Sequence, residues 1–160
     1  MPAPLIAASV AEFIQSGLSI TVAARSERLV PSIAKAVGCK VDDARGEVTL
    51  LLFAEAAAAV CRDIAGNGHV AACFSRPSTN ETVQVKGDDA RFALATPAEV
   101  AVARRCLDGL IDDLTPQGLD PRLLEAFFWG ATEDLLAIRF TPQAAFKQTP
   151  GPGAGAALQA

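Results

Sequence analysis

Hydrophobic and polar residues alternate along several stretches of the chain, and this alternation predicts short β-strands. The predicted strands cover residues 18–25, 29–40, 47–53, 69–74, part of 81–94, and 135–140. Apolar residues at helical spacing predict helices over residues 4–16, 54–64 and 121–129, and a longer helix that starts at Thr96. The sequence therefore predicts a chain of about six strands with helices placed between some of them.

The connections between these elements favour an antiparallel arrangement. Short turns near Ser26 and at Asp42–Gly46 join the first three predicted strands, and short turns are typical of antiparallel pairs. Strands and helices do not alternate throughout, which disfavours a doubly wound parallel sheet. We expect a mainly β fold, a six-stranded antiparallel barrel with peripheral helices, as one domain over residues 1–148. A Gly/Pro-rich tail over residues 149–160 follows it.

Composition and charge exclude several classes of partner. The formal net charge is −4 and no long basic run is present, which argues against a nucleic-acid-binding protein. The first 24 residues contain no Lys or Arg, so the charged region of a signal peptide is missing. The apolar run Val48–Cys61 contains Glu55 and is too short to span a bilayer. We expect a cytoplasmic protein with no nucleic-acid or membrane partner.

The cysteines and the histidine do not form a metal-binding pattern. No two of Cys39, Cys61, Cys73 and Cys106 have metal-ligand spacing, and His69 is the only histidine. Each cysteine lies in an apolar segment, which favours buried thiols over disulfides and suits a reducing compartment. The sequence also lacks a GxSxG elbow, a Walker loop and a GxGxxG turn. We assign no catalytic acid or base.

One polar stretch, Phe74–Gly87, lies between two predicted strands and collects groups that bind anions. An arginine binds phosphate through its planar fork, and hydroxyl, amide and ammonium groups add further donors. The candidate side chains are Ser75, Arg76, Ser78, Thr82, Gln84 and Lys86. Two interpretations stay open: a site for a phosphate-bearing ligand, or an ordinary turn followed by a solvent-facing strand.

Three segments resemble the pyridoxamine 5′-phosphate oxidase-related, FMN-binding split-barrel proteins. They are Ser32–Gly38, Phe74–Pro77 leading into Val83–Gly87, and the ending Gln148–Gly155. The resemblance implies a six-stranded split barrel, a homodimer with an FMN at each end of the subunit interface, and a flavin-dependent oxidoreductase of unknown substrate.

The resemblance also implies which residues contact the cofactor. The oxidase itself has an Arg-Gln-Val-Arg-Val-Glu-Gly strand, which places Thr82 at the flavin-contacting glutamine. Its Ser-Arg-Lys phosphate motif is replaced here by Phe53–Ala57, so oxidation of pyridoxamine 5′-phosphate is not expected. Lys35, Arg76 or Lys86 would then supply the positive charge, with help from the N-terminus of the 54–64 helix. The implied cofactor-binding residues are Ser32, Lys35, Ser75, Arg76, Ser78, Thr82, Gln84 and Lys86.

Two alternatives keep the same fold. The first is a non-catalytic flavin-binding dimer. The second is haem binding in the same cleft, with His69 as the only histidine available as an axial ligand. Phe127, Phe128 and Trp129 form an aromatic cluster, which we interpret as either a subunit contact or ordinary core.

Overall fold

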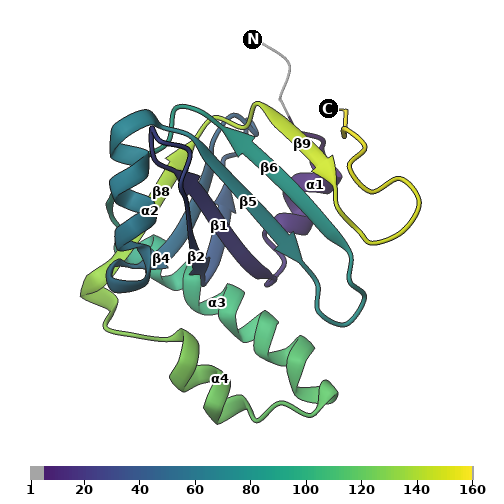
Figure 1. Ribbon diagram of the computed structural model, residues 1–160. Helices are drawn as coiled ribbons and strands as arrows, with labels where there is room; N and C mark the ends of the chain where they lie inside the picture. The colour runs from purple at the N-terminus through teal and green to yellow at the C-terminus, as the bar shows by residue number, and fades with distance from the viewer. Residues whose placement is uncertain (1–5, 160) are drawn as a thin grey trace.

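The computed structural model describes residues 6–159 and shows a mainly β chain with two antiparallel sheets and peripheral helices (Figure 1). The first sheet has the order β2 (Pro31–Ala36), β1 (Ser19–Arg25), β5 (Val70–Ser75), β6 (Thr82–Gly87) and β9 (Ala144–Lys147). The second has the order β3 (Gly38–Val41), β4 (Val48–Phe53), β8 (Leu135–Phe140) and β7 (Arg91–Leu94). The predicted fold class, mainly β and antiparallel, is confirmed.

The predicted number of six strands is wrong, because the described chain forms nine. The stretch 29–40 divides into β2 and β3, which lie in different sheets. Four consecutive buried residues, Ala36–Cys39, mark the crossing, where strict alternation between two faces stops. A Cβ on Gly38 would lie 2.8 Å from the Cα of Ala103, so only glycine lets the chain cross this close to a helix. The other additional strands, β7 and β9, are four-residue strands with few buried side chains.

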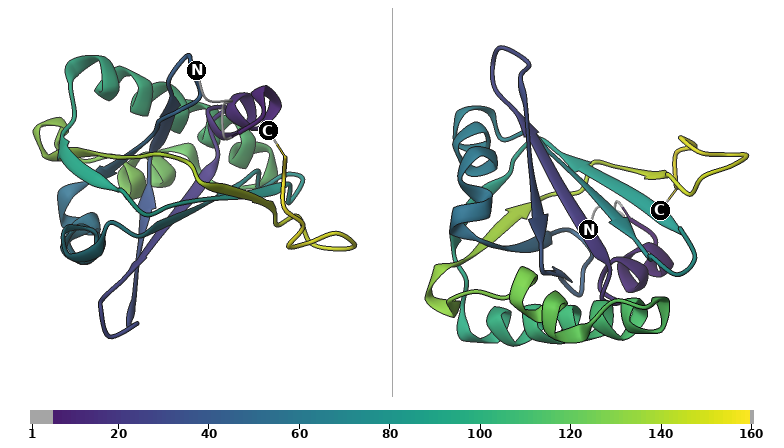
Figure 2. Two further views of the ribbon diagram at one scale, coloured as in Figure 1. Left: turned by 90° about the horizontal axis from the view of Figure 1, so that it is seen from above. Right: turned by 60° about the horizontal axis from the view of Figure 1, so that its bottom comes forward.

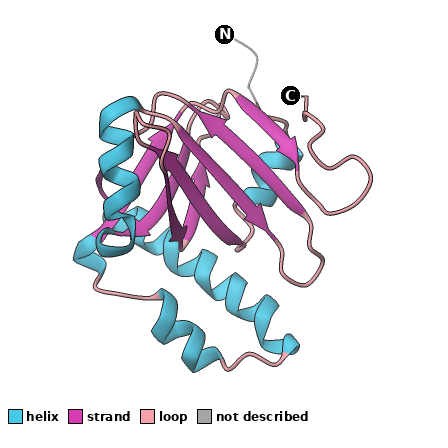
Figure 3. Cartoon of the chain, viewed as in Figure 1, coloured by secondary structure: helices cyan, strands magenta, loops and turns pink. Residues whose placement is uncertain are grey.

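Four α-helices surround the sheets (Figure 3). They are α1 (Ala8–Ile14), α2 (Ala54–Asn67), α3 (Pro97–Leu114) and α4 (Pro121–Phe128), with 3-10 turns at Thr115–Gln117 and Thr132–Asp134. The predicted start of α3 is confirmed, because the Thr96 hydroxyl accepts from the amide of Glu99 at 3.3 Å and the Glu99 carboxylate accepts from the amide of Thr96 at 2.8 Å. The start of the predicted first helix, Pro4, lies outside the described residues.

The core lies between the two sheets and beneath α2. Buried side chains from both sheets meet there, with helical partners: Val22, Leu50, Val60, Ile64, Ala72, Phe74, Ile138 and Phe140. Helix α4 lies beside α3, away from this core (Figure 1), and Leu124 is its buried residue. The opposite face of the first sheet has no helix packed on it, and its side chains on β1 and β5 are only half-buried. The loop between β1 and β2 projects from the body (Figure 2).

A buried ion pair fastens the beginning of α3 to the second sheet. Glu99 is only 6% exposed, and Arg139 on β8 donates to its carboxylate. Burial raises the pKa of Glu99, but the Thr96 amide and the Arg139 guanidinium outweigh that effect and hold the pKa below its usual value. The ion pair therefore sets the position of the helix relative to β8.

The C-terminal tail runs back beside β9. Phe146 pairs with Ala157, the amide of Lys147 donates to Ala156 at 2.9 Å, and the amide of Leu158 donates to Ala145 at 2.8 Å. The predicted domain boundary at residue 148 stays a prediction. Within residues 6–159, no helix is both long and apolar enough to cross a membrane.

Candidate functional site

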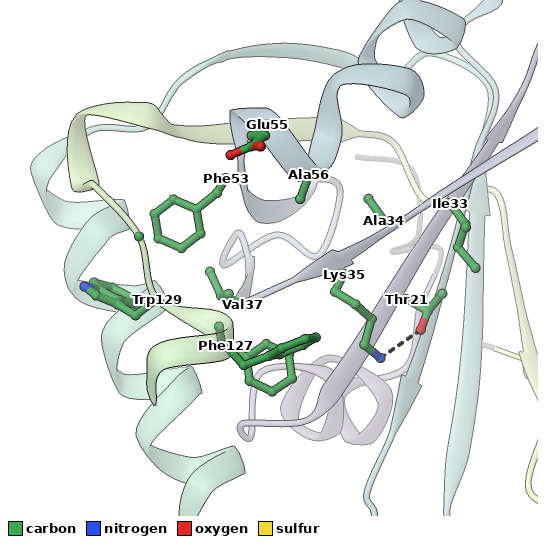
Figure 4. Close-up of a pocket in the computed structure, with 12 residues that line it drawn as sticks. Thr21, Ile33, Ala34, Lys35, Val37, Phe53, Glu55, Ala56, Phe127 and Trp129 are labelled. Carbon is green, nitrogen blue, oxygen red and sulfur yellow. Dashed lines mark hydrogen bonds between the residues drawn. The ribbon is translucent and has the colours of Figure 1, made fainter. Parts of the chain in front are cut away.

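A cavity of about 650 Å³ lies where β2, the junction between β4 and α2, and the end of α4 meet (Figure 4). We call it the first cavity. Its lining is mainly apolar, with one lysine and one glutamate: Thr21, Ile33, Ala34, Lys35, Val37, Phe53, Glu55, Ala56, Phe127, Phe128, Trp129 and Gly130. Ligand sites commonly combine an apolar wall with a few polar groups.

One wall of the first cavity is aromatic. The rings of Phe53 and Trp129 meet edge to face, with centroids 5.6 Å apart, and Phe127 and Phe128 meet in the same way at 4.8 Å. Gly130 packs close to the same ring, because a Cβ there would lie 3.2 Å from a ring carbon of Phe53. This wall presents flat apolar surfaces to the cavity.

Arg104 on α3 holds the wall in place. Its guanidinium lies 4.6 Å from the centre of the Trp129 ring and pairs with Glu125 of α4 at 2.6 Å. It also pairs with Asp108, one turn along α3, at 2.6 Å. These contacts raise the pKa of Arg104, and the hydrogen bond to Glu125 is the main cause. Arg104 thus links α4, and Trp129 just after it, to α3.

Lys35 is the cation of the first cavity. Its ammonium donates to the hydroxyl of Thr21 at 3.1 Å (Figure 4) and to the hydroxyl of Ser19 at 2.7 Å, and both hydroxyls belong to β1. Partial burial of the ammonium lowers the pKa of Lys35, although the residue as a whole is exposed. The two hydroxyls fix the charged group against the sheet, where it faces the cavity.

The N-terminus of α2 forms another part of the lining. Phe53 is the N-cap residue and supplies no side-chain acceptor, so the first amide groups of the helix have no side-chain cap. Such amides, together with the helix dipole, favour an anion. Glu55 in the first turn lines the same cavity and opposes an anion there. An anionic group would therefore be attracted by Lys35 and the helix end and repelled by Glu55.

Of the predicted cofactor-binding residues, Lys35 is the one that lines the first cavity. Ser32 belongs to the same strand but points to the opposite, buried face, because side chains alternate along a strand. Its hydroxyl is buried and has no hydrogen-bond partner among the described residues. Ser32 is thus separated from the cavity by the strand itself.

Four of the other predicted residues lie around the turn between β5 and β6 and are engaged within the chain. The hydroxyls of Ser75 and Thr82 are 2.8 Å apart, and Arg76 donates to the hydroxyl of Ser16 at 2.9 Å. The amide of Ser78 donates to Asp113 at 3.0 Å, and its hydroxyl donates to the same carboxylate at 2.5 Å. These contacts hold the turn against α3 and the end of α1.

The last two predicted residues, Gln84 and Lys86, lie on the outer face of the first sheet, the face on which no helix packs. Gln84 accepts from the side chain of Gln148 at 3.4 Å, and the ammonium of Lys86 lies 5.2 Å from the centre of the Phe146 ring. Lys86 lines a second cavity, together with His69. Lys86 and Lys35 therefore line different cavities.

The aromatic residues of the first cavity were visible in the sequence, but their role was not. Phe127, Phe128 and Trp129 follow one another at a helix end, which indicates either a core or a contact surface. Phe127 is 76% exposed, so core packing does not explain it. Their position beside β2 depends on how α4 packs on α3, for which the sequence carries no local signal.

No family model and no curated protein matches the sequence. Solved structures do match the fold. An F420 reductase superimposes with a TM-score of 0.57 at 16% identity, over 86% of this chain and 95% of that chain. HupZ of Group A Streptococcus gives a TM-score of 0.56 at 12% identity, over 94% of this chain and 100% of that chain. A pyridoxamine 5′-phosphate oxidase-related, FMN-binding protein of Nostoc punctiforme gives 0.51 at 12% identity, over 91% and 84%. The likeness shows that this chain shares the fold of these proteins, as the sequence resemblance predicted.

Proposed function

We propose that the protein binds FMN in the first cavity and that its two sheets are the halves of a split barrel. The observation that carries this proposal is the composition of a single cavity of about 650 Å³. An aromatic wall, the ammonium of Lys35 and the uncapped N-terminus of α2 all border it. The shared fold with an FMN-binding protein supports the same assignment.

These groups fit the chemistry of FMN. Lys35 and the first amides of α2 would hold the phosphate, because both favour an anion. Phe53, Phe127 and Trp129 offer apolar surface for a flat ring system. Bound FMN would supply the redox chemistry, while the chain positions it and excludes water. We propose a flavin-dependent oxidoreductase on a substrate other than pyridoxamine 5′-phosphate.

Charge changes in the first cavity are expected to alter FMN affinity in opposite directions. Lys35→Gln removes the cation and is expected to weaken binding about 10- to 100-fold, the effect of losing a charge-assisted hydrogen bond. Glu55→Gln removes the opposing carboxylate and is expected to strengthen binding. The dissociation constant is measured by the quenching of FMN fluorescence during a titration.

Lys40→Gln, a change at an exposed lysine on β3, is the matched control and is expected to leave the affinity unchanged. The proposal is wrong if the unmodified protein takes up no FMN. If Lys35→Gln and Glu55→Gln both bind FMN as tightly as the unmodified protein does, FMN lies elsewhere. Anaerobic addition of NADH or NADPH to the loaded protein then tests the enzyme: a flavin that keeps its visible bands with both donors favours the non-catalytic alternative.

We also propose a homodimer whose contact surface borders the first cavity. Large apolar side chains are exposed on β2 and α4 around it: Ile33 at 68%, Leu123 at 70% and Phe127 at 76%. A cluster of this kind is costly to leave in water. A second copy of the chain would cover these side chains and enclose the cavity. This proposal uses the surface on β2 and α4 alone.

Phe127→Glu is expected to convert the dimer into a monomer, because it places a charge in the apolar contact. Light scattering after size-exclusion chromatography at micromolar concentration measures the mass. Leu94→Glu is the control, since Leu94 is similarly exposed at 67% but lies on β7 in the other sheet. A monomeric unmodified protein, or a Phe127→Glu variant that stays dimeric, would contradict this contact surface.

Haem binding through His69 gains no support from the first cavity, because His69 lines the second one. The four cysteines are free thiols in the described chain, and three of them are buried. These free thiols are consistent with a cytoplasmic location, which we retain as part of the proposal.

A further inference from the structure

A second cavity of about 480 Å³ lies on the outer face of the first sheet. Three basic residues line it, and each comes from a different strand or strand end: Arg25 at the end of β1, His69 just before β5, and Lys86 on β6. We call these three the basic cluster. Its position is separate from the first cavity, and the two sets of lining residues have no member in common.

Strand register brings the basic cluster to one face. Ala71 pairs directly with Ala23 on one side and with Lys86 on the other, and paired residues point to the same face of a sheet. Arg25 lies two residues after Ala23 on β1 and so shares that face, and His69, just before β5, lines the same cavity. The basic side chains therefore surround a floor made of two alanine methyl groups.

The small side chains at the base of the second cavity leave room for a ligand next to the basic side chains. Ala23 and Ala71 are half-buried and carry no side chain beyond Cβ, and Ala144 borders the same cavity. The ammonium of Lys86 lies over the ring of Phe146 at 5.2 Å, a contact that limits its freedom to turn away from the sheet. The basic side chains thus lie at the rim of a shallow site whose base is apolar.

The side chains of the basic cluster form no ion pair within the described chain. No carboxylate of residues 6–159 lies within salt-bridge distance of Arg25, His69 or Lys86, whereas Arg91, Arg104 and Arg139 each have an acidic partner. Asp88 also lines the cavity; its carboxylate accepts from the side chain of Gln143 and opposes an anion there, as Glu55 does in the first cavity. The guanidinium of Arg25 has one long contact, to the carbonyl of Ser26 at 3.4 Å.

We propose that the second cavity binds a small molecule through a phosphate or diphosphate group. Arg25 offers a planar fork for two phosphate oxygens, Lys86 a compact charge, and His69 a ring N–H donor. In a chain with a formal net charge of −4, this cluster is a local positive site. The site does not depend on FMN binding, because it shares no lining residue with the first cavity.

Isothermal titration calorimetry of the 160-residue chain with inorganic pyrophosphate tests the site. The unmodified protein is expected to bind pyrophosphate, with an affinity that falls as salt rises. Arg25→Gln and Lys86→Gln are each expected to weaken binding by about tenfold or more, because each removes a charge-assisted contact. Asp88→Asn is expected to strengthen binding. Thermal unfolding midpoints of the variants show whether each remains folded.

Two control variants separate this site from other basic groups. Lys147→Gln, on the neighbouring strand β9 but outside the cavity, is expected to leave pyrophosphate affinity unchanged. Lys35→Gln is expected to leave it unchanged as well, and Lys86→Gln to leave FMN affinity unchanged. The proposal is overturned if pyrophosphate does not bind at millimolar concentration, or if folded Arg25→Gln and Lys86→Gln bind as tightly as the unmodified protein. Tighter binding of citrate than of pyrophosphate would overturn the phosphate assignment.

Discussion

Replacing Arg139 with methionine is expected to lower the free energy of unfolding by about 3 kcal/mol. The change leaves the carboxylate of Glu99 buried without its cation, and an uncompensated buried charge typically costs about 3–5 kcal/mol. The Thr96 amide still donates to Glu99, which places the expected value at the lower end of that range. Urea denaturation at pH 7 measures the difference.

The pH dependence of this effect has a defined sign. The pKa of Glu99 is held below its ordinary value of 4.5 in the folded protein, so its contribution to stability is present above that pH and is lost as the pH falls through the folded pKa. Arg139→Met removes one of the two causes of that shift and leaves the Thr96 amide, so the deficit relative to the unmodified protein is expected to shrink as the pH falls below that value and Glu99 becomes protonated.

Arg91→Met is the matched control for Arg139→Met. Arg91 faces Arg139 across the β7–β8 pair and has its own partner, Glu47, at 2.5 Å, but this ion pair is exposed. Its loss is expected to cost less than about 1 kcal/mol. Equal losses of stability in the two variants, or a deficit in Arg139→Met that does not change with pH, would show that Glu99 is not held in its charged form by Arg139.

Gly17→Ala is expected to destabilise the protein by about 3 kcal/mol. Gly17 has a φ of 79°, a left-handed conformation that costs a residue with a Cβ about 1 kcal/mol or more. The added Cβ would also lie 2.8 Å from the carbonyl oxygen of Cys106 and 2.9 Å from the Cα of Gly109, both in the backbone of α3. Relieving such overpacking costs about 1–3 kcal/mol more.

Gly109→Ala tests the same contact from the helix side. A Cβ there would lie 3.3 Å from the Cα of Gly17, a smaller overlap, and alanine favours the helix by about 1 kcal/mol. We expect the two effects nearly to cancel, so that the urea midpoint changes little. If Gly109→Ala proves as destabilising as Gly17→Ala, close packing rather than the left-handed backbone at Gly17 accounts for the loss.

Local signals in the sequence were sufficient for most elements of the fold. Thr96-Pro97-Ala98-Glu99 contains every residue that a capped helix start needs, and α3 begins there. The division of 29–40 into β2 and β3 was missed, because Val37 and Gly38 continue an apolar run and the change of sheet is set by the contact of Gly38 with α3. The short strand β9 was missed for a related reason, since it is defined by its pairing with β6.

The candidate site was less predictable than the fold. In the stretch richest in donors, Ser75–Gly87, Arg76 donates to Ser16 and Ser78 donates to Asp113, so these groups attach the turn to the end of α1 and to α3. Lys35 was chosen for its charge, but its place beside the aromatic wall depends on α4, which is 86 residues further along the chain at Pro121. The chemical properties of a single side chain can be predicted from the sequence, whereas the lining of a cavity depends on which distant residues pack beside it.

The return of the tail along β9 also bears on how the protein avoids aggregating. A sheet edge with free backbone donors and acceptors is a template on which another chain can add a strand. The hydrogen bonds from Lys147 to Ala156 and from Leu158 to Ala145 occupy that side of β9. The glycine- and proline-rich segment between them gives the tail the reversal it needs, and its composition resists recruitment into a growing sheet. In the described chain the tail thus closes the β9 edge of the first sheet against the addition of a strand from another chain.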